Sequence, residues 1–216
     1  MARFKKTCRP LPGRLTLNIK CMTMDTTSML PVPAPSLTEQ FEKQAREYLR
    51  LQREPGEKCS LADAQFAIAR SYGFGSWAKL TEFTVRINRP YSEVMQFESA
   101  VNAVVTGDIA TLTALLRGNP ELVHLRSMRM HHASLLHYVS GNGVEGYRRQ
   151  SPANAVAIAR LLLDAGAEVD APYPGPDGDM TALGLVATSI QAQRTGVQHA
   201  LIETLLNAGA RNNMKM

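Results

Sequence analysis

Residues 162–167 read Leu-Leu-Asp-Ala-Gly-Ala and residues 205–210 read Leu-Leu-Asn-Ala-Gly-Ala, so one short motif occurs twice, 43 positions apart. Two adjacent leucines followed by glycine indicate the end of a helix, because glycine adopts the left-handed conformation of a helix C-terminus without a Cβ penalty. A related pair lies upstream, with Ser-Leu-Leu-His at 134–137 and Thr-Ala-Leu-Gly at 181–184. A weaker, earlier copy consists of Gly107, Leu112, Leu115 and Leu116. Such internal similarity predicts an array of repeated units.

The motif spacing predicts three consecutive helix pairs. Each pair has one apolar face that it cannot bury alone, so neighbouring pairs are expected to stack and bury their faces against each other. The paired leucines would form the inner seam of this stack, at 115–116, 162–163 and 205–206. We expect first helices near 96–105, 133–140 and 180–190, and second helices near 109–117, 152–165 and 196–208.

The second and third repeats are longer than the first and therefore carry insertions. From the helix-opening Ser or Thr to the second paired leucine, the three repeats span 17, 29 and 25 residues. The extra residues fall at 141–152 and near 191–196. Insertions in repeat proteins map to loops, often on a functional face, so both segments are predicted to be surface loops.

This part of the chain resembles ankyrin repeats, in which Thr-Pro-Leu-His opens a first helix and a second helix carries paired leucines, followed by Gly-Ala and a finger loop. The resemblance covers about 96–210, but no copy has the proline and only His137 keeps the histidine. The chain is also similar to a group of bacterial ankyrin-repeat proteins of largely unassigned function. The members of this group continue with a further repeat beyond the position of Ala210. The C-terminal cap of 96–216 is therefore expected to be missing. The stretches that carry this similarity are 135–139, 143–145, 181–189, 68–70, 73–74 and 76–77.

The resemblance implies a non-catalytic protein–protein interaction module whose partner contacts a concave surface of first helices and finger tips. Tyr and Arg are enriched where interfaces are energetically strongest, which guides the choice of contact residues. For Tyr138, on a first helix, packing in the core is the alternative to a role as an aromatic anchor. The predicted partner contacts are Arg126, Arg129, His131 and His132 in the first finger, Tyr173, Asp177 and Asp179 in the second, and Tyr138.

A helical module is expected at 36–92, ahead of the repeats. Its helices are predicted to begin at Ser36, Ser60 and Ser76, where a hydroxyl can cap the free N–H groups of a helix start. The fold class is therefore predicted as all-α, an N-terminal helical module followed by a short ankyrin-like helical solenoid.

Two other functions remain open. The pair of helices at 61–87 also fits a helix-turn-helix, in which the second helix would read DNA through Lys79, Arg86 and Arg89. A DNA-binding regulator that uses this pair and the basic tail is one alternative. A truncated, non-functional relative of the repeat proteins is the other.

The positive charge of the chain is confined to its beginning. The formal net charge is +5, and residues 1–30 hold six basic groups and one acidic group, whereas 31–216 hold eighteen of each. A domain that grips phosphates concentrates Lys and Arg on itself, so nucleic acid is an unlikely partner. The segment 1–35 is predicted as a disordered, basic, proline-containing tail, with a targeting peptide or a nucleic-acid arm as alternatives. Met22 or Met24 could also be the true start.

No pattern in the sequence points to catalysis. The three cysteines lack metal-type spacing, and no phosphate-binding loop or nucleophile motif is present. Four of the five histidines fall at 124–137, but none pairs with another at i, i+4, and His137 is better explained as a local cap with Ser134. We therefore predict no enzyme activity, no cofactor, no metal and no membrane association, in a cytoplasmic protein.

Overall fold

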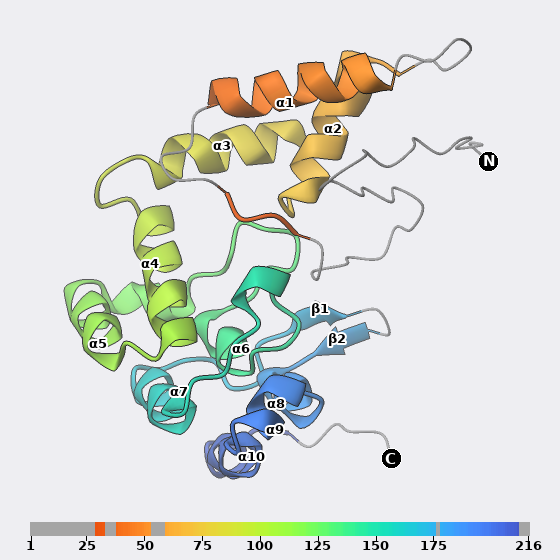
Figure 1. The fold of residues 1–216 in the computed structure, drawn as a ribbon. Coiled ribbons are helices and arrows are strands. Elements are labelled where there is room, and N and C mark those ends of the chain that lie inside the picture. Colours follow the sequence, from red (N-terminus) through yellow and green to blue (C-terminus); the bar gives the residue numbers. More distant parts are fainter. Residues whose placement is uncertain (1–28, 33–37, 53–58, 176–177, 212–216) are drawn as a thin grey trace.

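The computed structural model describes residues 29–32, 38–52, 59–175 and 178–211. In this part the chain is mostly helical, with one small two-stranded sheet (Figure 1), which confirms the helical character of the predicted fold. No helix of the described part is both long and apolar enough to cross a membrane. The helices are α1 (Thr38–Leu51), α2 (Leu61–Ser71), α3 (Trp77–Ile87), α4 (Glu93–Thr106), α5 (Ile109–Gly118), α6 (Leu135–Val139), α7 (Ala155–Asp164), α8 (Ala182–Ala187), α9 (Ile190–Arg194) and α10 (Gln198–Asn207), and the strands are β1 (Tyr173–Gly175) and β2 (Gly178–Met180).

Helices α1 to α3 pack around an aromatic core. Ser60 begins α2 with a complete capping box, and Ser76 caps α3 by accepting the backbone N–H of Lys79, as predicted; Ser36 lies outside the described residues. Phe74 and Phe83 place their rings 5.0 Å apart in this core. Its fully buried larger side chains are Phe41, Tyr48, Ile68, Phe74, Leu80 and Phe83.

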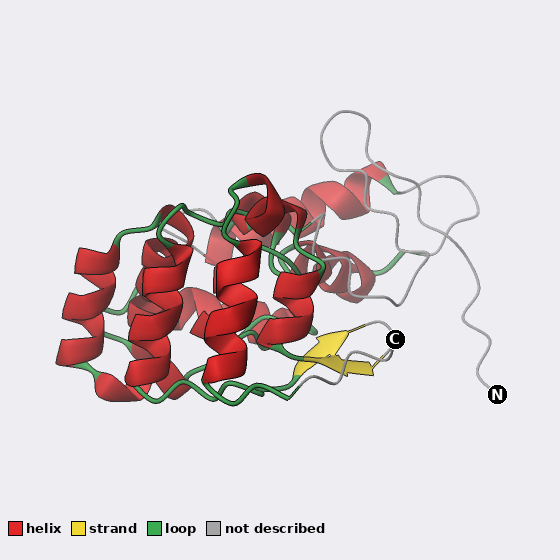
Figure 2. Ribbon diagram, turned by 90° about the horizontal axis from the view of Figure 1, so that it is seen from below, coloured by secondary structure: helices red, strands yellow, loops and turns green. Residues whose placement is uncertain are grey.

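A second, larger core lies between helices α4 to α10. Helix α4 contacts α5 and α6, α6 contacts α7 and α8, and α10 contacts α7 and α8, so the helices form a row that Figure 2 shows side by side. Each of the six helix ranges expected from the sequence contains a helix. The range 180–190 contains all of α8 and the first residue of α9, because α8 ends at Ala187 and α9 begins at Ile190.

The paired leucines are not equally buried, which corrects the predicted seam. Leu162 and Leu205 are almost completely buried, whereas Leu206 is 41% exposed and Leu163 only partly buried. Consecutive side chains of a helix point about 100° apart, so one leucine of each pair is buried, while Leu115 and Leu163 pack against the core only in part. The glycines behave as expected, since Gly166 and Gly209 have φ angles of 95° and 93°.

The beginning of the described chain also differs from its prediction. Residues 29–32 belong to the segment predicted as disordered, yet Met29 is buried and the backbone N–H of Leu30 donates to the carbonyl of Ser71 at 2.8 Å. The Met29 side chain lies over Gly73, where an added Cβ would come within 2.7 Å of its sulfur. This apolar contact and the backbone hydrogen bond stabilise the ordered position of residues 29–32, although the flanking sequence is polar and contains several prolines.

Candidate functional site at the first finger

The first finger, residues 119–134, connects α5 to α6 and rests on the N-terminal helices. It is closed by a bridge between Arg126 and Ser134, and the N–H of Ser127 donates to the carbonyl of Ala133 at 2.9 Å. At its tip the N–H of Met130 donates to the carbonyl of Gly73 at 2.8 Å. The finger is therefore in contact with the part of the chain that precedes the helix row.

Arg129 is the residue of the finger that joins the two cores. Its guanidinium carbon lies 5.7 Å from the ring centre of Phe74 and 5.2 Å from that of Phe83, which are cation–π distances. On its other side, Nη1 donates to Glu98 of α4 at 2.7 Å, and Nε lies 3.2 Å from Glu145. Only 1% of Arg129 is exposed, so this arginine is shared by the aromatic core and two buried carboxylates.

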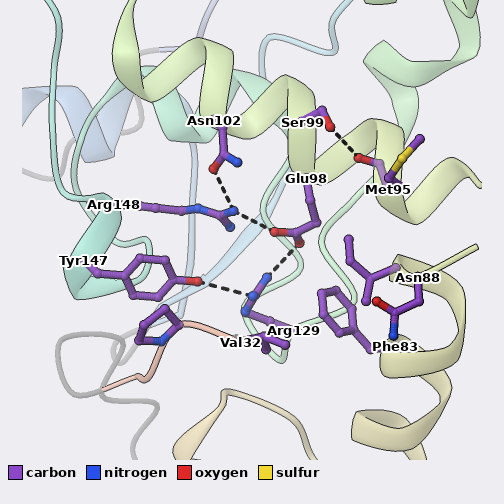
Figure 3. A pocket seen from close by; sticks show the side chains of 12 residues that line it. Val32, Phe83, Asn88, Met95, Glu98, Ser99, Asn102, Arg129, Tyr147 and Arg148 are labelled. Carbon is purple, nitrogen blue, oxygen red and sulfur yellow. Dashed lines mark hydrogen bonds and ion pairs between the residues drawn. The ribbon is translucent and has the colours of Figure 1, made fainter. Parts of the chain in front are cut away.

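A second arginine completes what we call the buried charge cluster: Glu98, Arg129, Glu145 and Arg148. Nη2 of Arg148 lies 2.7 Å from Glu98, and its Nη1 lies 3.5 Å from Glu145 (Figure 3 shows the Glu98 side). His131 and the hydroxyl of Tyr138 approach Glu145 at 3.3 and 3.2 Å. With two carboxylates and two guanidiniums the cluster is electrically balanced, which is the condition for keeping charges in a protein interior.

The cluster keeps both carboxylates ionised. Burial by itself raises the pKa of Glu98 and of Glu145, but Arg129 and Arg148 outweigh it and hold both pKa values below the usual range. Burial likewise lowers the pKa of Arg129, and the two glutamates more than reverse this. Neither glutamate can therefore exchange a proton near neutral pH, so the arrangement favours holding elements together over acid–base chemistry.

Four of the predicted partner contacts lie inside the molecule, and for these the prediction is corrected. Arg129, His131, Tyr138 and Tyr173 are each no more than 4% exposed. The N-terminal helices cover Arg129, and the ring of Tyr173 stacks on that of His131 with 6.1 Å between centres. Tyr138 takes the core position that the sequence left as its alternative, with its hydroxyl bonded to Glu145. These side chains serve the chain's own packing.

The remaining predicted contacts differ in position. His132 and Asp179 are exposed, and the Arg126 side chain is 30% exposed, so a partner contact stays a prediction for these three; Asp177 lies outside the described residues. Arg126 donates through Nη1 to the carbonyl of Pro172 at 2.8 Å, and its Nη2 lies 3.3 Å from Glu168. Arg126 therefore joins the first finger to the segment that leads into β1.

His137 has the local role that the sequence indicated. The N–H of Ser134 donates to its Nδ1 at 3.0 Å, which leaves the proton of the neutral ring on Nε2. That Nε2 lies 3.1 Å from the carbonyl of Ala171, a partner that can only accept. Burial, against the opposing effect of the Ala171 carbonyl, lowers the pKa of His137 to about 4, so the ring is neutral in the folded chain.

Sequence reasoning missed Glu98, Glu145 and Arg148. The insertion 141–152 was predicted as a surface loop, but it folds inward, and Val144 and Glu145 are completely buried. The closest guanidinium to its carboxylate is that of Arg129 in the finger, and nothing local in the sequence indicates that contact. Glu98 could have been found from the sequence, because it lies at helical spacing on the same buried face as Val94 and Val101.

A cavity of about 400 Å³ opens beside the cluster (Figure 3). Helices α3 and α4, the segment 29–32 and the 3-10 helix Gly146–Arg148 surround it. Its apolar lining consists of Pro31, Val32, Phe83, Ile87 and Met95, and its polar lining of Asn88, Glu98, Ser99, Asn102, Arg129, Tyr147 and Arg148.

Comparisons of the chain with family models, curated proteins and solved structures found no match. The chemistry of the site is therefore argued from its own residues. In the described part of the chain, no three His, Cys, Asp or Glu side chains gather as a metal ion requires. Of the residues proposed to read DNA, Lys79 and Arg86 both lie 3.4 Å from Glu82, and Arg86 also lies 3.6 Å from Glu93.

Proposed function

We propose that this chain is a non-catalytic protein–protein interaction module of ankyrin-repeat type, with helices α4 to α10 as a short solenoid. The observation that carries the proposal is the row of helix pairs with two neighbouring fingers, 119–134 and the β1–β2 hairpin, on one side. In a stacked array each pair buries its apolar face against the next, and the loops between pairs remain to contact a partner.

The second finger is the better candidate for the partner surface. Strands β1 and β2 pair Tyr173 with Met180, and the buried Tyr173 ring anchors the hairpin from below. Asp179 is exposed on β2, where its carboxylate can meet a basic group of a partner. The tip of the first finger is partly occupied by the N-terminal helices, which leaves His132 and Arg126 as its accessible groups.

The electrostatics of the interior support a non-catalytic role. Each carboxylate of the buried charge cluster lies against both arginines, which keeps it ionised and makes it a weak base toward a substrate proton. The buried His137 ring uses both of its nitrogens in local bonds. The charged groups of the cluster and the His137 ring are thus engaged in contacts that hold the elements of the chain together.

Affinity capture followed by a binding assay tests the proposal. The full chain, immobilised, is expected to retain a specific protein from cell extract, and the purified partner should then bind in solution. Reversal of the charge at the second finger by Asp179→Lys should weaken binding about tenfold or more, the usual effect of placing like charges together in an interface. Glu42→Lys is the control, because the Glu42 side chain is 43% exposed and lies on α1, which is part of neither finger.

Equal loss with both variants would indicate a nonspecific charge effect, and no loss with Asp179→Lys or with Arg126→Glu would exclude the finger surface. The DNA-binding alternative is tested in parallel with random duplex DNA at low salt, where phosphate contacts act on any sequence. Binding that is lost with Lys79→Glu and kept with Asp179→Lys would favour DNA and contradict the proposal.

A further inference from the structure

The cavity beside the buried charge cluster has the size and wall chemistry of a small-molecule site. Its volume of about 400 Å³ lies in the ordinary range for ligand pockets, which is about 300–1,000 Å³. Phe83, Ile87 and Met95 give it an apolar side on α3 and α4, and Val32 adds to this side from the segment 29–32. A ligand body of hydrocarbon or aromatic character would be well desolvated there.

The polar side of the cavity carries two guanidinium groups. Arg129 and Arg148 belong to its lining together with one carboxylate, Glu98. The second carboxylate of the cluster, Glu145, is completely buried and is not part of the lining, but it lies 3.2 Å from Arg129 and 3.5 Å from Arg148 and balances their charge. A ligand in the cavity therefore meets guanidinium groups on this side, while the cluster as a whole is neutral.

The donors of this polar side are not all used. The Tyr147 hydroxyl accepts a hydrogen bond from Nη2 of Arg129 at 3.3 Å, and its own proton has no acceptor among the described residues. Arg148 is only 7% exposed, yet its Nε and Nη1 make no hydrogen bond in the described part of the chain, although Nη1 lies 3.5 Å from Glu145. Both oxygens of Glu98, in contrast, are occupied by the arginines.

The Tyr147 hydroxyl is protonated at neutral pH, because the pKa of a tyrosine is ordinarily near 10 and burial raises it further. Figure 3 shows this hydroxyl pointing toward Arg129 at the side of the cavity. Asn102 also has donors without a protein acceptor. Its side-chain carbonyl oxygen accepts a hydrogen bond from Arg148 at 2.9 Å, and its amide N–H groups have no acceptor among the described residues. The cavity thus offers unused donors and two guanidinium groups next to an apolar wall.

We propose that this cavity binds a small carboxylate with an apolar body, with the carboxylate at Tyr147 and the body against Phe83 and Met95. A carboxylate has only acceptors, so it matches the unused donors, and a hydrogen bond to an ionised acceptor is stronger than one to a neutral acceptor. The site is separate from the finger surface proposed for a protein partner. Failure of either proposal leaves the other standing.

Calorimetric titration of the full chain with 4-phenylbutyrate and with 4-phenylbutanol tests the site. The two probes share the apolar body and differ in the charged group. We expect the acid to bind about tenfold more tightly, the difference that one charge-assisted hydrogen bond supplies. Backbone NMR shifts upon addition of the acid should concentrate in 95–102 and 146–148.

Tyr147→Phe keeps the ring and removes the donor, so it should reduce binding of the acid about tenfold and leave binding of the alcohol unchanged. Tyr91→Phe is the matched control, because Tyr91 is 85% exposed and does not line the cavity. Ser99→Phe, which places a ring in the cavity, should abolish binding of both probes while circular dichroism confirms the fold. The proposal is overturned if neither probe binds, if both bind equally, or if Tyr147→Phe and Tyr91→Phe behave alike.

Discussion

Arg129 shows how one residue can connect two hydrophobic cores. A buried charge is costly, and an arginine lowers that cost by donating from several directions of a planar group that also stacks on aromatic rings. Here Glu98 and Tyr147 accept hydrogen bonds from the guanidinium, and Glu145 forms an ion pair with it at 3.2 Å. Phe74 and Phe83 lie at cation–π distance from the guanidinium. Removal of any one partner leaves another charge buried without compensation.

Arg129→Ala is therefore expected to lower the free energy of unfolding by about 3–5 kcal/mol, the usual effect of breaking a buried ion pair. Arg129→Lys should cause a smaller loss, because it keeps the charge but not the planar fork. Urea denaturation followed by circular dichroism measures both. Arg50→Ala is the control: Arg50 pairs with Glu47 on the exposed face of α1, so its removal should not change stability measurably. A similar result for Arg129→Ala and Arg50→Ala would contradict this role.

His137 predicts a defined pH dependence of stability. In the unfolded chain the ring binds a proton near its ordinary pKa of 6.5, whereas in the folded chain it does so only near 4. Between these values the unfolded state holds more protons, so stability falls as the pH falls from 6.5 toward 4, by about 3 kcal/mol in all. The buried glutamates act in the same direction at lower pH.

Urea denaturation at several pH values, for the wild type and for His137→Gln, measures the contribution of this ring. Glutamine can still accept the Ser134 N–H, as in a common capping box, but it does not titrate. The slope between pH 6.5 and 4 should therefore become flatter in the variant. His199→Gln, at a side chain 87% exposed, should keep the slope of the wild type. An unchanged slope in His137→Gln would show that another group controls this range.

At the scale of elements, the junction between α4 and α5 depends on a glycine with little space around it. Gly107 ends α4 with a φ angle of 81°, and its carbonyl accepts the Asn154 amide at 2.7 Å, which ties the first helix pair to the second. An added Cβ at this position would lie 2.6 Å from the Asn154 oxygen and 3.0 Å from Pro152. This turn therefore needs glycine for two reasons: the left-handed φ angle, and the close approach of Asn154 and Pro152.

Gly107→Ala should destabilise the chain by about 1–2 kcal/mol from the left-handed conformation alone, with a further loss from the contact with Asn154. Gly118→Ala is the matched control, because Gly118 is the last residue of α5 and an added Cβ meets nothing within 4 Å. That variant should be neutral or slightly stabilising, since alanine favours a helix more than glycine does. Thermal unfolding of both variants compares them, and equal losses would contradict the steric argument.

At the scale of the whole molecule, the first finger makes the two cores dependent on each other. The N-terminal helices bury Arg129, and Met130 bonds to Gly73, while the same finger begins the helix row through α6. Helix α4 also serves both cores, since Val94 packs in the first and Phe97 in the second. We therefore expect both parts to unfold together.

The single tryptophan, Trp77, provides a probe of the N-terminal part alone, because it lies on α3. In the wild type, the tryptophan fluorescence and the far-UV circular dichroism transitions should coincide in urea, as for a two-state protein. In Arg129→Ala the fluorescence transition should move to lower urea than the dichroism transition. Separate transitions in the wild type would show that the finger does not couple the cores.

The sequence alone determined the local elements. The Leu-Leu-x-x-Gly-Ala motifs placed α7 and α10, Ser60 and Ser76 placed the starts of α2 and α3, and the spacing of Ser134 and His137 indicated their mutual bonds. Capping and helix termination are decided by groups within a few residues of each other, so their signals lie in a short stretch of sequence.

Only the tertiary structure decided which charged residues are inside. Arg129 and His131 have the sequence of an exposed finger, and Glu145 that of an inserted loop, yet all three are buried because elements far apart in the sequence meet around them. The burial of a charge is stable only when its partners are brought to the same place, and here Glu98 comes from α4, Phe83 from α3 and Phe74 from the turn before α3. The linear sequence gives the charged residues but does not show which of them come together. The packing of the finger therefore decided both the cluster and the cavity beside it.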